Sequence, residues 1–143
     1  MPAIERTITV DQPLDVVWDF LTDFTTTEQW DPPTVTTQRV SGDGGVGTVY
    51  RNVSSMLGKE VEVEYTVAEI QPRSLFRLAG TTTAMDLLDT MRFEQTPAGV
   101  QITYIAEFHP RGAAKLATPL MPLGLKKIGD DAAQSMQETL ARL

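Results

Sequence analysis

The stretch RGAAKLATPLMPLGLKKIGDDAAQSMQETLARL, residues 111–143, decides the fold. Apolar side chains recur mostly three or four residues apart along it, which is the spacing of one face of an α-helix. These positions are Leu116, Leu120, Leu123, Ile128, Ala132, Met136, Leu140 and Leu143. Charged and amide side chains stand between them. The pattern predicts one long amphipathic helix, and a helix of this kind needs a broad apolar surface to lie on.

Three residues interrupt this helix: Pro119, Pro122 and Gly124. Proline lacks a backbone N–H and clashes with the preceding turn, so we expect the chain to kink or loosen here. Two interpretations stay open. The interruption forms a mobile entrance flap, or it bends the helix around the surface beneath it.

Segments with alternating apolar and polar residues supply that surface. The clearest spans residues 60–70, where one face carries Val61, Val63, Tyr65 and Val67 and the other carries Glu60, Glu62, Glu64 and Thr66. Such alternation is typical of an antiparallel sheet with one buried and one solvated face. Further strands are predicted at residues 4–10, 34–40, 47–54, 75–79, 85–95 and 100–108.

Two short helices are predicted between the first two strands. Pro13 suits a first helical turn, and an apolar stripe follows it. Thr25 and Glu28 have the spacing of a capping box, and a second helix opening there must stop before Pro32. The element order predicts an α+β fold: a curved antiparallel sheet gripping the C-terminal helix, with an internal cavity between them.

Composition limits the class of protein. A chain of 143 residues predicts a single domain, residues 1–143. It has no apolar run of about 18 residues, so we expect no stable membrane insertion. The absence of cysteine, and an N-terminus without an apolar signal core, fit a cytoplasmic location. Nineteen acidic and twelve basic residues give a net charge of -7, which opposes nucleic-acid binding.

Several features in chain order resemble the START-like helix-grip superfamily (SRPBCC), especially its polyketide cyclase/dehydratase-like branch. They are the Pro13 helix with Trp18 and Phe20, Asp23 with Trp30-Asp31-Pro32, Gly45-Val46-Gly47-Thr48, Val67-Ala68-Glu69-Ile70-Gln71-Pro72, and the Pro-Leu-Met-Pro-Leu interruption. The resemblance implies a ligand cavity between the concave sheet and the long helix. This fold hosts binding proteins, cyclases and lipid carriers alike, so no catalytic residue is transferred.

The sequence gives little support for a metal, cofactor or phosphate site. His109 is the only histidine, which leaves no His/Asp cluster, and its place out of phase beside Pro110 predicts an exposed rim residue. The glycines of residues 42–47 join two strands and lack the Lys-Ser/Thr of a phosphate loop. We therefore expect a turn there, no metal and no cofactor.

Asp89 is the one candidate acid. It alternates in phase with Leu87 and Met91, which we expect to face inward, and a buried carboxylate is costly unless it is hydrogen-bonded, paired or hydrated. In one interpretation, Asp89 is an acid of the pocket or accepts a hydrogen bond from a ligand. Alternatively a β-bulge turns it outward, or an arginine such as Arg51 pairs with it.

Tyr65 and Tyr104 share the inward phase of their strands, where each hydroxyl could anchor a ligand or bond within the core. The residues predicted to line the cavity are Trp30, Tyr65, Phe76, Met85, Leu87, Asp89, Met91, Tyr104, Phe108, Leu120, Met121 and Ile128. Most are apolar or aromatic, so the predicted partner is a small apolar molecule.

Three functions are compatible with these residues. The first is binding of a small or medium apolar, aromatic or lipid-like molecule in the cavity. The second is a polyketide cyclase/dehydratase-like enzyme with Asp89 as acid/base. The third is a protein interaction or dimerisation module, although Glu60, Glu62 and Glu64 make the outer sheet a poor homodimer seam. The sequence leaves monomer and homodimer undecided.

Overall fold

Seven antiparallel strands form one sheet in the order β1-β7-β6-β5-β4-β3-β2. The computed structural model describes residues 2–56, 58–115 and 121–143. The strands are β1 (Ala3–Val10), β2 (Thr34–Ser41), β3 (Val49–Met56), β4 (Lys59–Gln71), β5 (Leu75–Thr81), β6 (Met85–Thr96) and β7 (Gly99–Pro110). Each strand predicted from alternation is present, and the predicted α+β class is confirmed.

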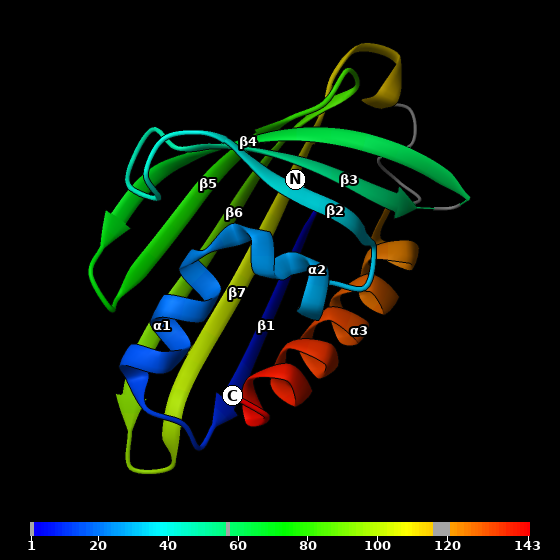
Figure 1. Ribbon diagram of the computed structural model, residues 1–143. Helices are drawn as coiled ribbons and strands as arrows, with labels where there is room; N and C mark the ends of the chain where they lie inside the picture. Colours follow the sequence, from blue (N-terminus) through cyan, green and yellow to red (C-terminus); the bar gives the residue numbers. More distant parts are fainter. Residues whose placement is uncertain (1, 57, 116–120) are drawn as a thin grey trace.

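The helices lie on the concave side of this sheet (Figure 1). They are α1 (Leu14–Thr22), the 3₁₀ helix η1 (Phe24–Thr26), α2 (Thr27–Trp30) and α3 (Met121–Ala141). The first three fall between β1 and β2, while α3 returns along β1 beneath the curled strands β2, β3 and β4 (Figure 1). The arrangement is the predicted helix grip.

The main core fills the space between the sheet and the helices. Val17 and Leu21 of α1, Trp30 of α2 and Met136 and Leu140 of α3 are fully or almost fully buried in it. The sheet contributes the inward residues of β1 and β3 to β7, with Tyr50, Val67, Phe76, Leu78, Met91, Phe93 and Ile102 among them. Burial of so many large apolar side chains is the main stabilising term of the fold.

The predicted capping box is wrong. Asp23 caps η1 instead, because its Oδ1 accepts hydrogen bonds from the Thr25 backbone N–H at 3.1 Å and from the Thr25 hydroxyl at 2.6 Å. In a capping box, the Glu28 carboxylate would accept the backbone N–H of Thr25. It instead accepts the backbone N–H of Thr37 in β2 at 2.8 Å. Glu28 therefore ties α2 to the sheet rather than to its own first turn.

The C-terminal helix is shorter than predicted. Residues 112–115 form a 3₁₀ turn and α3 begins at Met121, so residues 111–115 are not α-helical. Gly112 has φ +55°, which lies outside the α-helical region, so no α-helix passes through this position. Pro122 sits in the first turn of α3, where a missing N–H costs nothing. Pro119 and the flap interpretation lie outside the described residues. Of the predicted stripe, Ala132, Met136 and Leu140 are buried and Leu143 is exposed.

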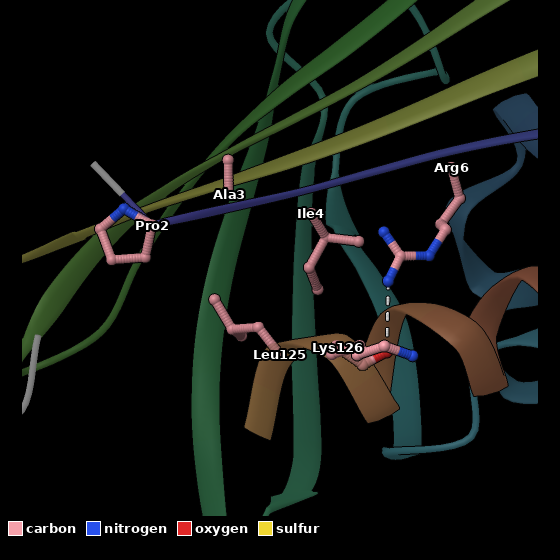
Figure 2. A pocket seen from close by; sticks show the side chains of 6 residues that line it. All are labelled: Pro2, Ala3, Ile4, Arg6, Leu125 and Lys126. Carbon is pink, nitrogen blue, oxygen red and sulfur yellow. Dashed lines mark hydrogen bonds between the residues drawn. The ribbon is translucent and has the colours of Figure 1, made fainter. Parts of the chain in front are cut away.

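Close contact with β1 positions α3. An added Cβ at Gly129 would lie 2.6 Å from Cγ2 of Ile4, so the glycine lets helix and strand approach. Arg6 reaches from β1 to donate to the backbone oxygen of Lys126 at 3.2 Å and to Asp130 at 3.0 Å. Figure 2 shows the hydrogen bond from Arg6 to Lys126. These two residues and Leu125 line a small hollow, whose volume is about 170 Å³.

Candidate functional site

A cavity of about 290 Å³ lies between the sheet and α3. Its walls come from the inner faces of β1, β3, β4, β6 and β7, and α3 covers it with Leu125, Ile128 and Ala132. The turn between β5 and β6, residues 82–84, forms part of its lining. The volume is close to the lower end of the ~300–1,000 Å³ found for small-molecule sites.

Seven of the residues predicted to line a cavity lie together around this one. They are Tyr65, Met85, Leu87, Asp89, Tyr104, Phe108 and Ile128. Six of them stand on strands in the phase that alternation assigns to the buried face, and Ile128 stands on the apolar stripe of α3. The geometry thus gathers most of the predicted set in one place.

Three predicted lining residues belong to the main core instead. Trp30, Phe76 and Met91 are almost completely buried and are absent from the cavity wall. Phe76 and Met91 pair across β5 and β6 further along the sheet. Alternation correctly predicted that Phe76 and Met91 face inward, but it does not show which inward residues lie level with the cavity. Leu120 and the side chain of Met121 lie outside the described part of the chain.

Asp89 is buried among apolar neighbours with one side-chain hydrogen bond. It is only 4% exposed, and its Oδ2 accepts the Tyr104 hydroxyl at 3.1 Å. The register of β6 with β5 and β7 continues unbroken past Asp89, so the alternative of an outward-turning bulge is wrong. Burial raises the pKa of Asp89 from 3.8 to about 7, although the Tyr104 hydrogen bond opposes that rise.

Arg51 does not pair with Asp89. It lies on the outer face of β3, is exposed, and pairs with Glu62 at 2.7 Å. The inner face of β3 carries Tyr50, Asn52 and Ser54, all buried. The arginine alternative for Asp89 is therefore wrong, and the acid stays in the cavity without Arg51.

Asp31 is a cavity residue that the sequence did not identify. It follows α2, lines the cavity, is half-buried, and its carboxylate accepts the Thr34 hydroxyl at 2.7 Å. Burial raises the pKa of Asp31 from 3.8 to about 6, against the opposing effect of that hydrogen bond. The negative charge of Asp31 also raises the pKa of Asp89. The only signal in the sequence was its place in the Trp30-Asp31-Pro32 motif.

A buried polar network supports Asp31 from behind. The amide of Asn52 donates to the hydroxyls of Thr37 at 2.8 Å and Thr34 at 3.2 Å. The hydroxyl of Ser54, which lines the cavity, donates to the side-chain Oδ1 of Asn52 at 2.7 Å. Because Thr34 in turn donates to Asp31, these bonds fix the orientation of the carboxylate relative to β2 and β3.

Tyr65 owes its place to a glycine. It stands opposite Gly80 in the β4–β5 register, and an added Cβ at Gly80 would lie 2.8 Å from the tyrosine ring. The ring also packs edge-on against Phe24, with centroids 4.9 Å apart. Burial, followed by the nearby acids Asp89 and Asp31, raises the pKa of Tyr65 well above its ordinary value. Its hydroxyl therefore stays protonated.

The cavity wall also contains apolar residues that were not among the predicted lining residues. Val61 and Val63 of β4 and Ala106 of β7 have the inward phase, and Leu125 and Ile4 join α3 to β1. Among the described residues, no group of three or more His, Asp or Glu side chains is arranged to hold a metal ion. His109, predicted to be exposed, is half-buried.

Comparison with solved structures shows the same fold in proteins of low sequence identity. A START superfamily protein from Mycobacterium smegmatis is 10% identical with a TM-score of 0.81, covering 98% of this chain and 97% of that one. The Zhui aromatase/cyclase from a Streptomyces species is 21% identical with a TM-score of 0.67, covering 99% and 85%. A major latex-like protein from Panax ginseng is 11% identical with a TM-score of 0.72, covering 96% and 95%.

None of the curated proteins matches this sequence. No helix in the described part of the chain is long and apolar enough to cross a membrane. The profile of one family, polyketide cyclase / dehydrase and lipid transport, matches residues 1–141, which is nearly the whole chain. The chain therefore belongs to this family, in agreement with the polyketide cyclase/dehydratase-like branch predicted from the sequence.

Proposed function

We propose that this protein binds a small apolar or aromatic molecule in the cavity beneath α3. The supporting observation is the cavity itself, because its wall is mainly aliphatic and aromatic with a few convergent polar groups. Small-molecule sites have this composition. A volume of about 290 Å³ favours a compact ligand over a long lipid chain. The exposed Glu60, Glu62 and Glu64 on the outer face of β4 support this function over an apolar dimer seam there.

Filling the cavity tests this function. Ala106 lines the cavity and is 4% exposed, whereas Ala79 of β5 is exposed on the outer face of the same sheet. Ala106→Leu should weaken binding of 1-naphthylmethanol at least tenfold in isothermal titration calorimetry, because the added atoms occupy ligand space. Ala79→Leu is the matched control and should bind like the parent. Equal binding by all three proteins, or none by the parent, would contradict the proposal.

A second candidate function is favoured by the Asp89–Tyr104 pair. A carboxyl group with a pKa of about 7 in a cavity can both take and return a proton near neutral pH. In a cyclase/dehydratase-like reaction, Asp89 would take a proton from the attacking carbon as the new C–C bond forms and give it to the alkoxide left on the attacked carbonyl. It would then take the second proton from the same carbon and give it to the hydroxide that leaves as the C–O bond breaks, which forms the C=C bond and releases water. Asp89→Asn should then abolish water loss from a linear poly-β-ketone, followed by mass spectrometry. An unchanged rate in this variant would exclude Asp89 from that role.

A further inference from the structure

Two carboxyl groups face the cavity, and no positive side chain lines it. Asp31 and Asp89 belong to the wall, while none of the twelve Lys and Arg residues does, nor does His109. The residues outside the description, 1, 57 and 116–120, carry no basic side chain either. No basic side chain in the lining is therefore placed to pair with these acids.

Asp89 has capacity left to bind such a partner. Its Oδ2 accepts from Tyr104, whereas its Oδ1 accepts no hydrogen bond within the described ranges, and the residue lines the cavity. A carboxylate removed from water is costly unless it is paired and hydrogen-bonded. A bound group with N–H donors and a positive charge would satisfy both requirements.

The rest of the lining suits a cation attached to an apolar body. Tyr65, Tyr104 and Phe108 present aromatic rings to the same cavity, and aromatic faces attract cations. The only titratable groups in the lining besides Asp89 are Asp31, Tyr65 and Tyr104. The cover from α3 and β1 is purely apolar and consists of Ile4, Leu125, Ile128 and Ala132.

We propose that the ligand is an amine with a compact apolar or aromatic body, whose ammonium group lies between Asp31 and Asp89. This inference rests on the proposed binding function and adds the chemical class of the ligand. The ammonium donates to the free oxygen of Asp89 and to Asp31, and the apolar body lies against α3. The cavity of about 290 Å³ limits that body to roughly the size of two fused rings.

Three probes with one ring system separate charge from apolar contact. They are 1-naphthylmethylamine, 1-naphthylmethanol and 1-naphthoate, compared by isothermal titration calorimetry at pH 8 and pH 5. At pH 8 the amine should bind about tenfold more tightly than the alcohol, or better, and the anion more weakly than both. The pKa of the probe's ammonium lies below that of a lysine side chain but above 8, so the probe is mostly charged at both pH values.

The pH dependence of amine binding reports the ionisation of Asp31 and Asp89. The pKa values in the free protein are about 6 for Asp31 and about 7 for Asp89, and an ammonium binds their ionised forms. Binding the amine therefore releases protons, and its advantage over the alcohol should shrink as the pH falls from 8 to 5. Asp89→Asn should lower the amine-to-alcohol affinity ratio at least fivefold at pH 8. Asp131→Asn, which removes an exposed acid paired with Lys127 on α3, should leave that ratio unchanged.

The outcomes distinguish the two proposals. Binding of the alcohol at least as tight as that of the amine overturns the amine inference and leaves the binding function standing. Tighter binding of the naphthoate than of the alcohol overturns the inference in the same way. Failure of all three probes to bind contradicts both proposals. The parent protein alone gives these results, so a misfolded Asp89→Asn variant does not prevent a decision.

Discussion

At the residue scale, the Tyr104 hydroxyl favours ionisation of Asp89 and partly offsets the effect of burial on its pKa. Tyr104→Phe removes the one side-chain hydrogen bond seen at this carboxylate while keeping the ring that packs edge-on against Trp30, with centroids 5.8 Å apart. Because that bond favours the charged form, its loss should raise the pKa of Asp89 above about 7. Carboxyl-carbon NMR titration measures this directly. Tyr65→Phe is the comparison, and an equal or larger rise in that variant would contradict the assignment.

The residues of the site differ in how far the sequence predicted them. Asp89 was predictable because β6 has no bulge and strict alternation carries the acid inward. Asp31 was not, since it lies in a turn between α2 and β2, where no period sets the direction of a side chain. In β3, Val49, Arg51 and Val53 alternate with Tyr50, Asn52 and Ser54, so neither phase is clearly apolar. Only the packed structure shows which face is inside.

At the scale of elements, the contact between α3 and β1 depends on a residue without a side chain. Gly129→Ala should destabilise the protein by about 1–3 kcal/mol in urea unfolding, because the new Cβ meets Ile4 at 2.6 Å and Arg6 at 2.9 Å. Gly124→Ala in the same helix has no neighbour within 4 Å and should stabilise by up to about 1 kcal/mol through helix propensity. A stabilising Gly129→Ala would show that helix and strand are less closely packed than the contact requires.

The elements themselves were largely predictable and their ends were not. Seven strands and two short helices follow from alternation and apolar spacing. The start of α3 did not, because the apolar spacing in the sequence begins at Leu116 whereas α3 begins at Met121. The Thr25–Glu28 spacing failed for a tertiary reason: Glu28 gains a hydrogen bond to β2 that no local pattern contains.

At the scale of the whole molecule, the two acids of the cavity, Asp31 and Asp89, should make stability depend on pH. Both folded-state pKa values, about 6 for Asp31 and about 7 for Asp89, lie above the ordinary 3.8, so the folded protein holds more protons than the unfolded chain between pH 4 and 7. The free energy of unfolding should therefore rise as the pH is lowered from 8 to 5. For Asp89 alone the shift corresponds to about 4 kcal/mol, as an upper value.

Two variants, Asp89→Asn and Asp131→Asn, test this pH dependence of stability. Asp89→Asn should be more stable than the parent at pH 8 and should show a flatter profile, because an amide has no charge to bury. Asp131→Asn removes an exposed acid and should keep the profile of the parent. Urea unfolding at several pH values provides both comparisons. A parent protein whose stability falls steadily from pH 8 to pH 5 would rule out this account of the two acids.

The central claim is that the cavity beneath α3 holds a small apolar molecule, and methyl NMR during titration with 1-naphthylmethanol tests it most directly. The account predicts saturable shifts of the Val63, Leu87 and Ile128 methyl signals, because these side chains line the cavity. The methyl signals of Val35, Val40 and Val46, which are exposed, should not move. Unchanged signals from the cavity, or shifts confined to the exposed valines, would contradict the claim.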